Sequence, residues 1–209
     1  KVYDDSFSHN HDLSITGGTE KTKVLFAVNY TDEDGMKLAS YYKRANVSLK
    51  VNQKIAKNVD ISLDTRYTNT KKMGDEGVRN GSGSVLSSSY RFRPIATENI
   101  LGDLNAMNEG MIENYAKQSQ WDRYNPVNRI NDNYSPKDYQ ALRGILSLNW
   151  EIVKGLTYHS DLSLNQSWNQ NKTWTGAIVN SYMDDNTGEI LYAGNAELEK
   201  SNKWGLRWS

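Results

Sequence analysis

The sequence predicts an all-β fold, an antiparallel up-and-down transmembrane β-barrel, of which this chain contains a partial barrel of about seven strands. Three observations lead to this prediction. Polar and apolar residues alternate over long runs, the connections between the runs alternate between short and long, and no apolar run approaches the ~18–20 residues that a membrane helix needs. Together they indicate a wall of strands with short turns on one rim and long loops on the other.

The clearest alternation lies in residues 42–53 and 58–70, where odd positions are apolar and even positions are polar. A period of two is typical of a strand with one apolar and one polar face. A pairing such as Val51 opposite Val59 would place both apolar sets on the same face. We therefore predict a β-hairpin here.

Similar alternation predicts the other strands. The predicted strands are 11–16, 23–31, 42–53, 58–70, 138–152, 156–168 and 203–209. The four longest runs, of 12 to 15 residues, exceed the ~9–11 residues that a tilted strand needs to cross a bilayer. Most of the predicted strands are long compared with the ~5–6 residues of an ordinary globular strand.

The connections between the predicted strands differ in length in a regular way. Short turns are predicted at 17–22, 54–57 and 153–155, and long loops at 32–41, 71–137 and 169–202. In an up-and-down sheet, alternate connections lie at the same edge, so the long loops share one rim. Outer-membrane barrels show this asymmetry, with short periplasmic turns and long extracellular loops.

The polar face of each strand would line a water-filled lumen, and the apolar face would contact outer-membrane lipid. The predicted lumen-lining residues are Arg44, Lys50, Asp60, Asp64, Arg66, Arg143, His159 and Asp161. His159 and Asp161 lie two positions apart in an alternating run, so their side chains point the same way. We interpret them as a hydrogen-bonded pair in the lumen rather than as a catalytic dyad.

An aromatic and amide-rich stretch of the longest loop is the candidate ligand-binding region. Flat aromatic faces beside amide, carboxylate and guanidinium groups suit sugar rings or extended peptides. The candidate ligand-binding residues are Tyr115, Trp121, Arg123, Tyr124 and Asn128. The alternative is that these aromatics hold the long loop to itself or to a partner protein.

The composition excludes several classes of function. The 25 basic and 25 acidic residues cancel, so no overall field would attract nucleic acid. Cysteine is absent, which excludes thiolate metal sites, disulfides and cysteine nucleophiles. No serine-hydrolase, P-loop or dinucleotide-binding motif occurs, so we expect neither an enzyme nor a resident cofactor.

Two groups of residues are candidates for metal binding. His9 and His11 could present two imidazoles, but no matching ligands follow at a fixed spacing, and ordinary surface polarity is the preferred interpretation. The acidic stretches 32–35 and 184–189 do not follow the calcium-loop pattern. Turn formation is therefore expected there, with calcium binding in an extracellular loop as the alternative.

Both ends of the chain suggest a piece of a longer protein. The first residue is Lys1 rather than methionine, and 203–209 alternates like an interrupted strand. The alternative is a mature secreted domain with an edge strand at its C-terminus.

Several segments resemble one known family and occur in the family's order. They are HDLSITGGTEKT at 11–22, LFAVNY at 25–30, YRFRPI at 90–95, NPV at 125–127, RGILSLNW at 143–150 and EIVKGLT at 151–157. Together they resemble the SusC/RagA-type TonB-dependent outer-membrane transporters over essentially all 209 residues. Any one of these segments alone would be a weak match.

The resemblance implies a barrel of roughly 22 strands that is filled by an N-terminal plug domain. It also implies a SusD-like surface lipoprotein over the extracellular mouth, and import of glycans or peptides with force transmitted through TonB. This chain would supply barrel wall and extracellular loops, without the plug, in the bacterial outer membrane.

Two other interpretations remain open at the level of sequence. One is a soluble, secreted β-sandwich that acts as a carbohydrate-binding module, since a soluble sandwich also has half-buried strands. The other, weaker, is an adhesin or structural barrel without active transport. Solubility of the chain without detergent would favour the sandwich.

Overall fold

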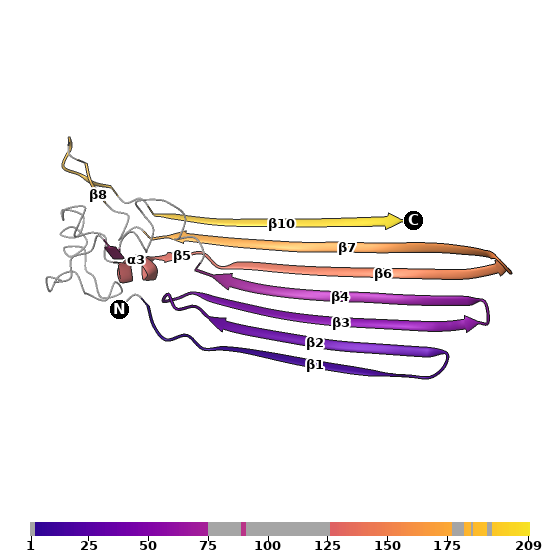
Figure 1. Ribbon diagram of the computed structural model, residues 1–209. Coiled ribbons are helices and arrows are strands. Elements are labelled where there is room, and N and C mark those ends of the chain that lie inside the picture. The colour runs from indigo at the N-terminus through magenta and orange to yellow at the C-terminus, as the bar shows by residue number, and fades with distance from the viewer. Residues whose placement is uncertain (1–2, 75–88, 91–125, 177–181, 185, 192–193) are drawn as a thin grey trace.

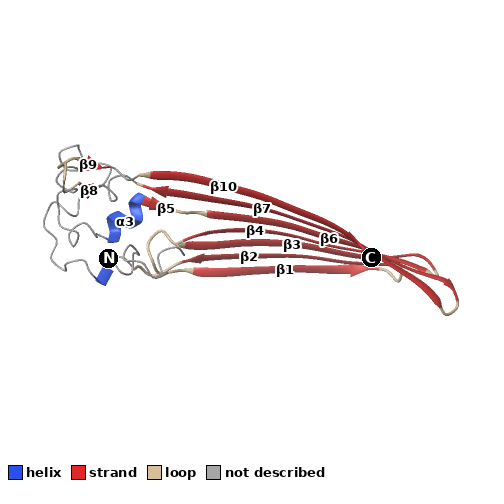
Figure 2. Ribbon diagram, turned by 90° about the horizontal axis from the view of Figure 1, so that it is seen from above, coloured by secondary structure: helices blue, strands red, loops and turns tan. Residues whose placement is uncertain are grey.

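The computed structural model contains one large antiparallel sheet (Figure 1), and it describes residues 3–74, 89–90, 126–176, 182–184, 186–191 and 194–209. The strands are β1 (Ser8–Gly18), β2 (Thr22–Asp34), β3 (Tyr41–Ala56), β4 (Val59–Met73), β6 (Lys137–Val153), β7 (Leu156–Thr175) and β10 (Asn195–Trp208). They pair in the order β1-β2-β3-β4-β6-β7-β10, so each strand lies beside its neighbour in the chain. The sheet is curved but not closed, with β1 and β10 at its two edges (Figure 2).

Smaller elements gather at one end of this sheet (Figure 1). They are the helix α3 (Pro126–Asp132), the two-residue strand β5 (Asn133–Tyr134), which pairs with β7, and the hairpin of β8 (Tyr182–Met183) and β9 (Ile190–Leu191). The hairpin turns lie at the opposite end (Figure 1). Short turns and long connections therefore occupy different rims, as the sequence predicts. In the described part of the chain, no helix is long and apolar enough to cross a membrane.

Glycine permits two of the tight turns. Gly18 ends β1 with a φ of 154°, and a Cβ there would collide with the backbone of Thr22. Gly155 lies between β6 and β7 with a φ of 90°, which side chains disfavour. Both positions thus allow a reversal that other residues would strain.

The strands are longer than predicted, most clearly around the predicted loop 169–202. β7 continues to Thr175 and β10 begins at Asn195, and the two strands pair over all of this extra length. Residues 169–173 are polar on both faces of β7, so the alternation is interrupted there, although Trp174, Ala196 and Leu198 are apolar and lie on one face. Backbone hydrogen bonds do not require alternation, which is why the strands continue beyond the alternating region.

The register of the hairpin of β3 and β4 also differs from the predicted pairing of Val51 with Val59. Val51 pairs with Leu63 rather than with Val59, and the strands continue to Ala56 opposite Val59. Because the offset is an even number of residues, the apolar side chains still share one face. At the next hairpin, between β6 and β7, Trp150 lies opposite Tyr158, so two aromatic side chains share one face.

The sheet has no packed core on either face within the described residues. There, Ile130 of α3 is the one hydrophobic side chain that is fully buried, whereas Trp204 and Trp208 of β10 are each 74% exposed. A β-sandwich requires a second sheet against the first. Apart from the short strands β8 and β9, the described part of the chain contains none. The sandwich interpretation is therefore not supported.

Candidate functional site: a sheet with one apolar and one polar face

Cross-strand pairing aligns the apolar residues into continuous rows on one face of the sheet. One row contains Val24, Val51, Leu63, Leu146, Leu162 and Trp208, each opposite the next. The adjacent row contains Phe26, Leu49, Thr65, Gly144, Leu164 and Leu206. Rows of this kind extend from β2 to β10, so the sequence periods of separate strands combine into one apolar band.

A polar row limits this band toward the long connections. It contains Asp32, Lys43, Lys71, Asp138, Gln170 and Lys200 on the same face as the band. Lys43 Nζ lies 2.9 Å from Asp32 Oδ2, which also accepts a hydrogen bond of 2.9 Å from the Tyr30 hydroxyl. The apolar surface is thus a belt of limited height and not a whole face.

Aromatic residues lie along both borders of the belt. Tyr30 and Trp168 lie one row inside the polar row, and Trp150 faces Tyr158 near the short turns. Trp150 is 41% exposed and Tyr158 is 42% exposed, so neither is enclosed by the sheet. Tyrosine and tryptophan have an apolar body and a polar end, and they favour boundaries between water and an apolar phase.

All of the predicted lumen-lining residues lie on the other, polar face. Register shows this directly: Lys50 lies opposite Asp64, Asp60 opposite Asn149, and Arg66 opposite Arg143. Arg44, His159 and Asp161 occupy the same side of their strands by the alternation of side chains. The structure therefore brings these residues onto one surface.

A ladder of side-chain hydrogen bonds crosses the polar face from β1 to β4. Asn29 Nδ2 donates to Asp12 Oδ1 at 2.6 Å, and Asn46 Nδ2 donates to Asn29 Oδ1 at 3.0 Å. Thr68 Oγ1 and Arg44 Nε both donate to Asn46 Oδ1, at 2.9 and 3.2 Å. In the sequence, Asp12, Asn29 and Asn46 are marked only by polar positions in alternating runs, which many other residues share. Their alignment depends on the register between strands, which one strand's sequence does not give.

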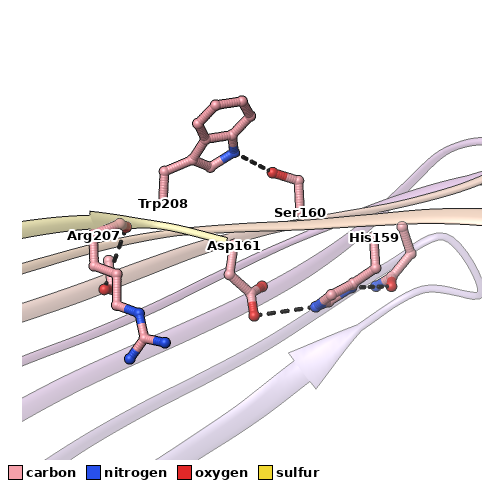
Figure 3. A network of polar contacts seen from close by, with 7 residues as sticks. His159, Ser160, Asp161, Arg207 and Trp208 are labelled. Carbon is pink, nitrogen blue, oxygen red and sulfur yellow. Dashed lines mark hydrogen bonds and ion pairs between the residues drawn. The ribbon is translucent and has the colours of Figure 1, made fainter.

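His159 and Asp161 form a polar group near the short turns (Figure 3). His159 Nδ1 lies 2.7 Å from Asn149 Oδ1, and His159 Nε2 lies 3.1 Å from Asp161 Oδ2. On the opposite face, Trp208 Nε1 donates to Ser160 Oγ at 2.7 Å. The pair thus anchors adjacent strands, and its placement in a lumen stays a prediction.

The structure does not describe the side chains of the candidate ligand-binding residues. Tyr115, Trp121, Arg123 and Tyr124 lie outside the described residues. Asn128 belongs to the helix α3, but its side chain is also outside the description.

The two candidate metal-binding groups have ordinary partners. The His9 and His11 rings lie 5.1 Å apart, centre to centre. Among the described residues, no three metal-ligating side chains come together. In the acidic stretch, Asp184 Oδ1 accepts the backbone N–H groups of Asn186 and Thr187, at 2.7 and 3.2 Å. This is an Asx turn.

Sequence comparison finds two receptors that are similar to this chain, although no family model matches it. TonB-dependent receptor P39 of Formosa agariphila is 29% identical over 157 residues, which cover 73% of this chain and 13% of that protein. TonB-dependent receptor P3 of the same organism is 28% identical over 98 residues, or 45% of this chain and 10% of that protein. The chain thus spans little more than a tenth of the length of these relatives.

Structure comparison shows the same kind of likeness at the level of the fold. The RagAB peptide importer in the 'open-open' state matches with a TM-score of 0.62 and 13% identity, covering 94% of this chain and 20% of that chain. The 'closed-closed' state matches with a TM-score of 0.55 and 14% identity, covering 80% of this chain and 18% of that chain.

A two-faced antiparallel sheet that matches part of a barrel wall defines the chain as part of an outer-membrane β-barrel protein. Within that class, the chain is similar in sequence to segments of TonB-dependent receptors, and its fold is like part of the RagAB importer barrel. Receptors of this kind are outer-membrane proteins. The predictions of fold class and location are confirmed, and so is the resemblance to TonB-dependent receptors.

Proposed function

We propose that this chain forms barrel wall in a TonB-dependent nutrient importer, with its apolar belt toward lipid and its polar face toward the lumen. The observation that carries the proposal is the alignment of apolar residues into rows across exposed strands, bounded by a polar row. A soluble protein would bury such a surface, whereas lipid stabilises it without a second protein layer.

The lengths of the strands support the same orientation. β7 contains 20 residues and β3 contains 16, whereas a tilted strand crosses the bilayer in ~9–11. The surplus lies toward the long connections, where most side chains of β7 and β10 are polar on both faces. These extensions would stand in water above the membrane and carry the extracellular loops.

The substrate we propose is a peptide or a glycan. The solved structure with the similar fold is described as a peptide importer, which favours peptides. The loop residues Tyr115, Trp121, Arg123, Tyr124 and Asn128 would contact the substrate, and a SusD-like surface lipoprotein would cover the same rim. TonB would supply the force for release into the periplasm.

Labelling of single cysteines tests the orientation of the two faces. These 209 residues contain no cysteine, so in a full-length receptor with any cysteine elsewhere replaced by serine, Leu49→Cys and Lys50→Cys place one thiol on either face of β3. A water-soluble maleimide should react with position 50, whereas a fluorophore attached at position 49 should be quenched by a nitroxide lipid. Equal behaviour at both positions would contradict the proposal.

Uptake assays test the importer itself. Cells that carry the full-length receptor should accumulate a labelled peptide or oligosaccharide, and deletion of TonB should abolish the accumulation. Surface binding that continues without TonB, with no accumulation in either strain, would instead indicate an adhesin or a structural barrel.

A further inference from the structure

The polar face carries two arginines directly opposite one another. Arg66 of β4 pairs in register with Arg143 of β6. Side chains at such positions lie about 5 Å apart at their Cβ atoms, and like charges there destabilise a sheet. Both side chains are exposed, and within the described residues neither makes a hydrogen bond or an ion pair. The pair therefore has no stabilising partner in this part of the protein.

A third guanidinium lies on the same face but farther along the strands, because Arg44 pairs in register with Thr70, four residues from Arg66. Arg44 of β3 is exposed, and its Nε donates to Asn46 Oδ1 at 3.2 Å, which leaves its two terminal amino groups for another acceptor. Arg44 and Arg66 line the same hollow of the polar face, together with Asn29, Asn46 and Ser48. Two adjacent strands, β3 and β4, thus present guanidinium groups to this depression, and Arg143 of β6 lies beside Arg66 outside its lining.

The acidic residues nearby do not neutralise this cluster. Asp12 lines the hollow, but its carboxylate oxygens accept hydrogen bonds from Asn10 and Asn29. Asp64 lies two residues from Arg66 on β4, and its partner in register is Lys50. The arginine cluster, defined here as Arg44, Arg66 and Arg143, therefore keeps a local positive charge in a chain whose formal net charge is zero.

We propose that the arginine cluster binds the carboxylates of acidic peptides that pass along the polar face of the barrel wall. Guanidinium groups present paired N–H donors that match the two oxygens of a carboxylate, which a lysine cannot do in the same way. The amide and hydroxyl groups of Asn29, Asn46 and Ser48 would form hydrogen bonds with the peptide backbone. This inference rests on the proposed import of peptides and adds a preference for acidic ones.

Peptide binding by the full-length receptor in detergent tests the inference. The probes are an oligopeptide of alternating glutamate and serine, and the same peptide with every glutamate replaced by glutamine. We expect Arg66→Gln with Arg143→Gln to weaken binding of the glutamate peptide about tenfold, on the scale of two exposed ion pairs, and to leave the glutamine peptide unchanged. Added salt should reduce the difference between the peptides.

Two further variants serve as controls. Arg207→Gln removes an arginine from the same face of β10, where its partner in register is Ser163, and it should leave binding of both peptides unchanged. Arg66→Lys with Arg143→Lys keeps both charges in case the glutamine variant fails to fold. It should lower the affinity for the glutamate peptide by a smaller factor.

Three outcomes would overturn the inference. Equal affinity of the unchanged receptor for both peptides would refute the acidic preference while leaving peptide import intact. Binding of neither peptide would refute peptide import as well. A lower unfolding temperature of the glutamine variant without peptide would show that the arginines hold a carboxylate of the receptor itself.

Discussion

At the scale of single residues, the polar face differs from a merely water-exposed surface because its side chains bond to one another. Asn29 donates to both Asn10 and Asp12 and accepts from Asn46, so one amide links three strands. Side-chain pairs across strands stabilise a sheet modestly, and a connected set contributes more than isolated pairs. This ladder therefore fixes the relative positions of β1, β2 and β3 on the side that lacks apolar packing.

Removal of the central amide should measure this contribution. We expect Asn29→Ala in the full-length receptor to lower the free energy of unfolding by about 1 kcal/mol, because Asp12 loses a donor and Asn46 an acceptor. The measurement is denaturant unfolding in lipid vesicles. Asn52→Ala, on the polar face of β3, is the matched control and should change little. An equal loss in both variants would contradict a special role for the ladder.

At the scale of the strand, the face to which a side chain points determines how much a charge at that position destabilises the protein. Leu49 lies in the middle row of the apolar belt, between Phe26 and Thr65, whereas Ser48 points to the polar face. Neighbouring residues of one strand thus face two different solvents. This is why a strand whose residues are polar on average can still cross a membrane.

Arginine substitutions one residue apart should separate the two faces. We expect Leu49→Arg to destabilise the folded receptor by about 2–4 kcal/mol, since an arginine on the lipid side must leave water. Ser48→Arg should cost less than about 1 kcal/mol, because its side chain stays hydrated. Denaturant unfolding in vesicles measures both. Similar losses would show that the apolar face does not meet lipid.

At the scale of the whole molecule, the sheet has two unpaired edges and an uncovered apolar belt. β1 and β10 end the path of paired strands, and their outer N–H and C=O groups have no partner strand within the described residues. Open edges and large apolar surfaces lead to association in water. The described structure therefore fits a piece of a larger wall better than a free domain.

Expression of residues 1–209 alone should reveal this incompleteness. We expect the chain to aggregate in buffer and to remain dispersed, with strand content by circular dichroism, in detergent micelles. Size-exclusion chromatography with light scattering checks the prediction. A soluble monomer without detergent would contradict the lipid-facing assignment of the apolar belt.

The part of the fold that could be predicted from the sequence is the part in which polar and apolar residues alternate along a strand. The runs 42–53 and 58–70 identify two strands and both of their faces, because the direction of a side chain depends only on its position along its own strand. The extended ends of β7 and β10 are not found in this way, because residues 169–173 are polar on both faces and only Trp174, Ala196 and Leu198 mark an apolar side there. The residues 115–124 of the candidate ligand-binding region lie outside the described structure, so their role stays a prediction.

The sequence by itself determined that this protein is a two-faced, up-and-down sheet, together with the family that it resembles. Only the tertiary structure decided which residues meet across strands: Arg66 opposite Arg143, Val51 opposite Leu63, and the ladder through Asn29. The physical reason is that alternation is a property of one strand. Register is a property of two, set jointly by backbone hydrogen bonds, turns and the matching of apolar side chains.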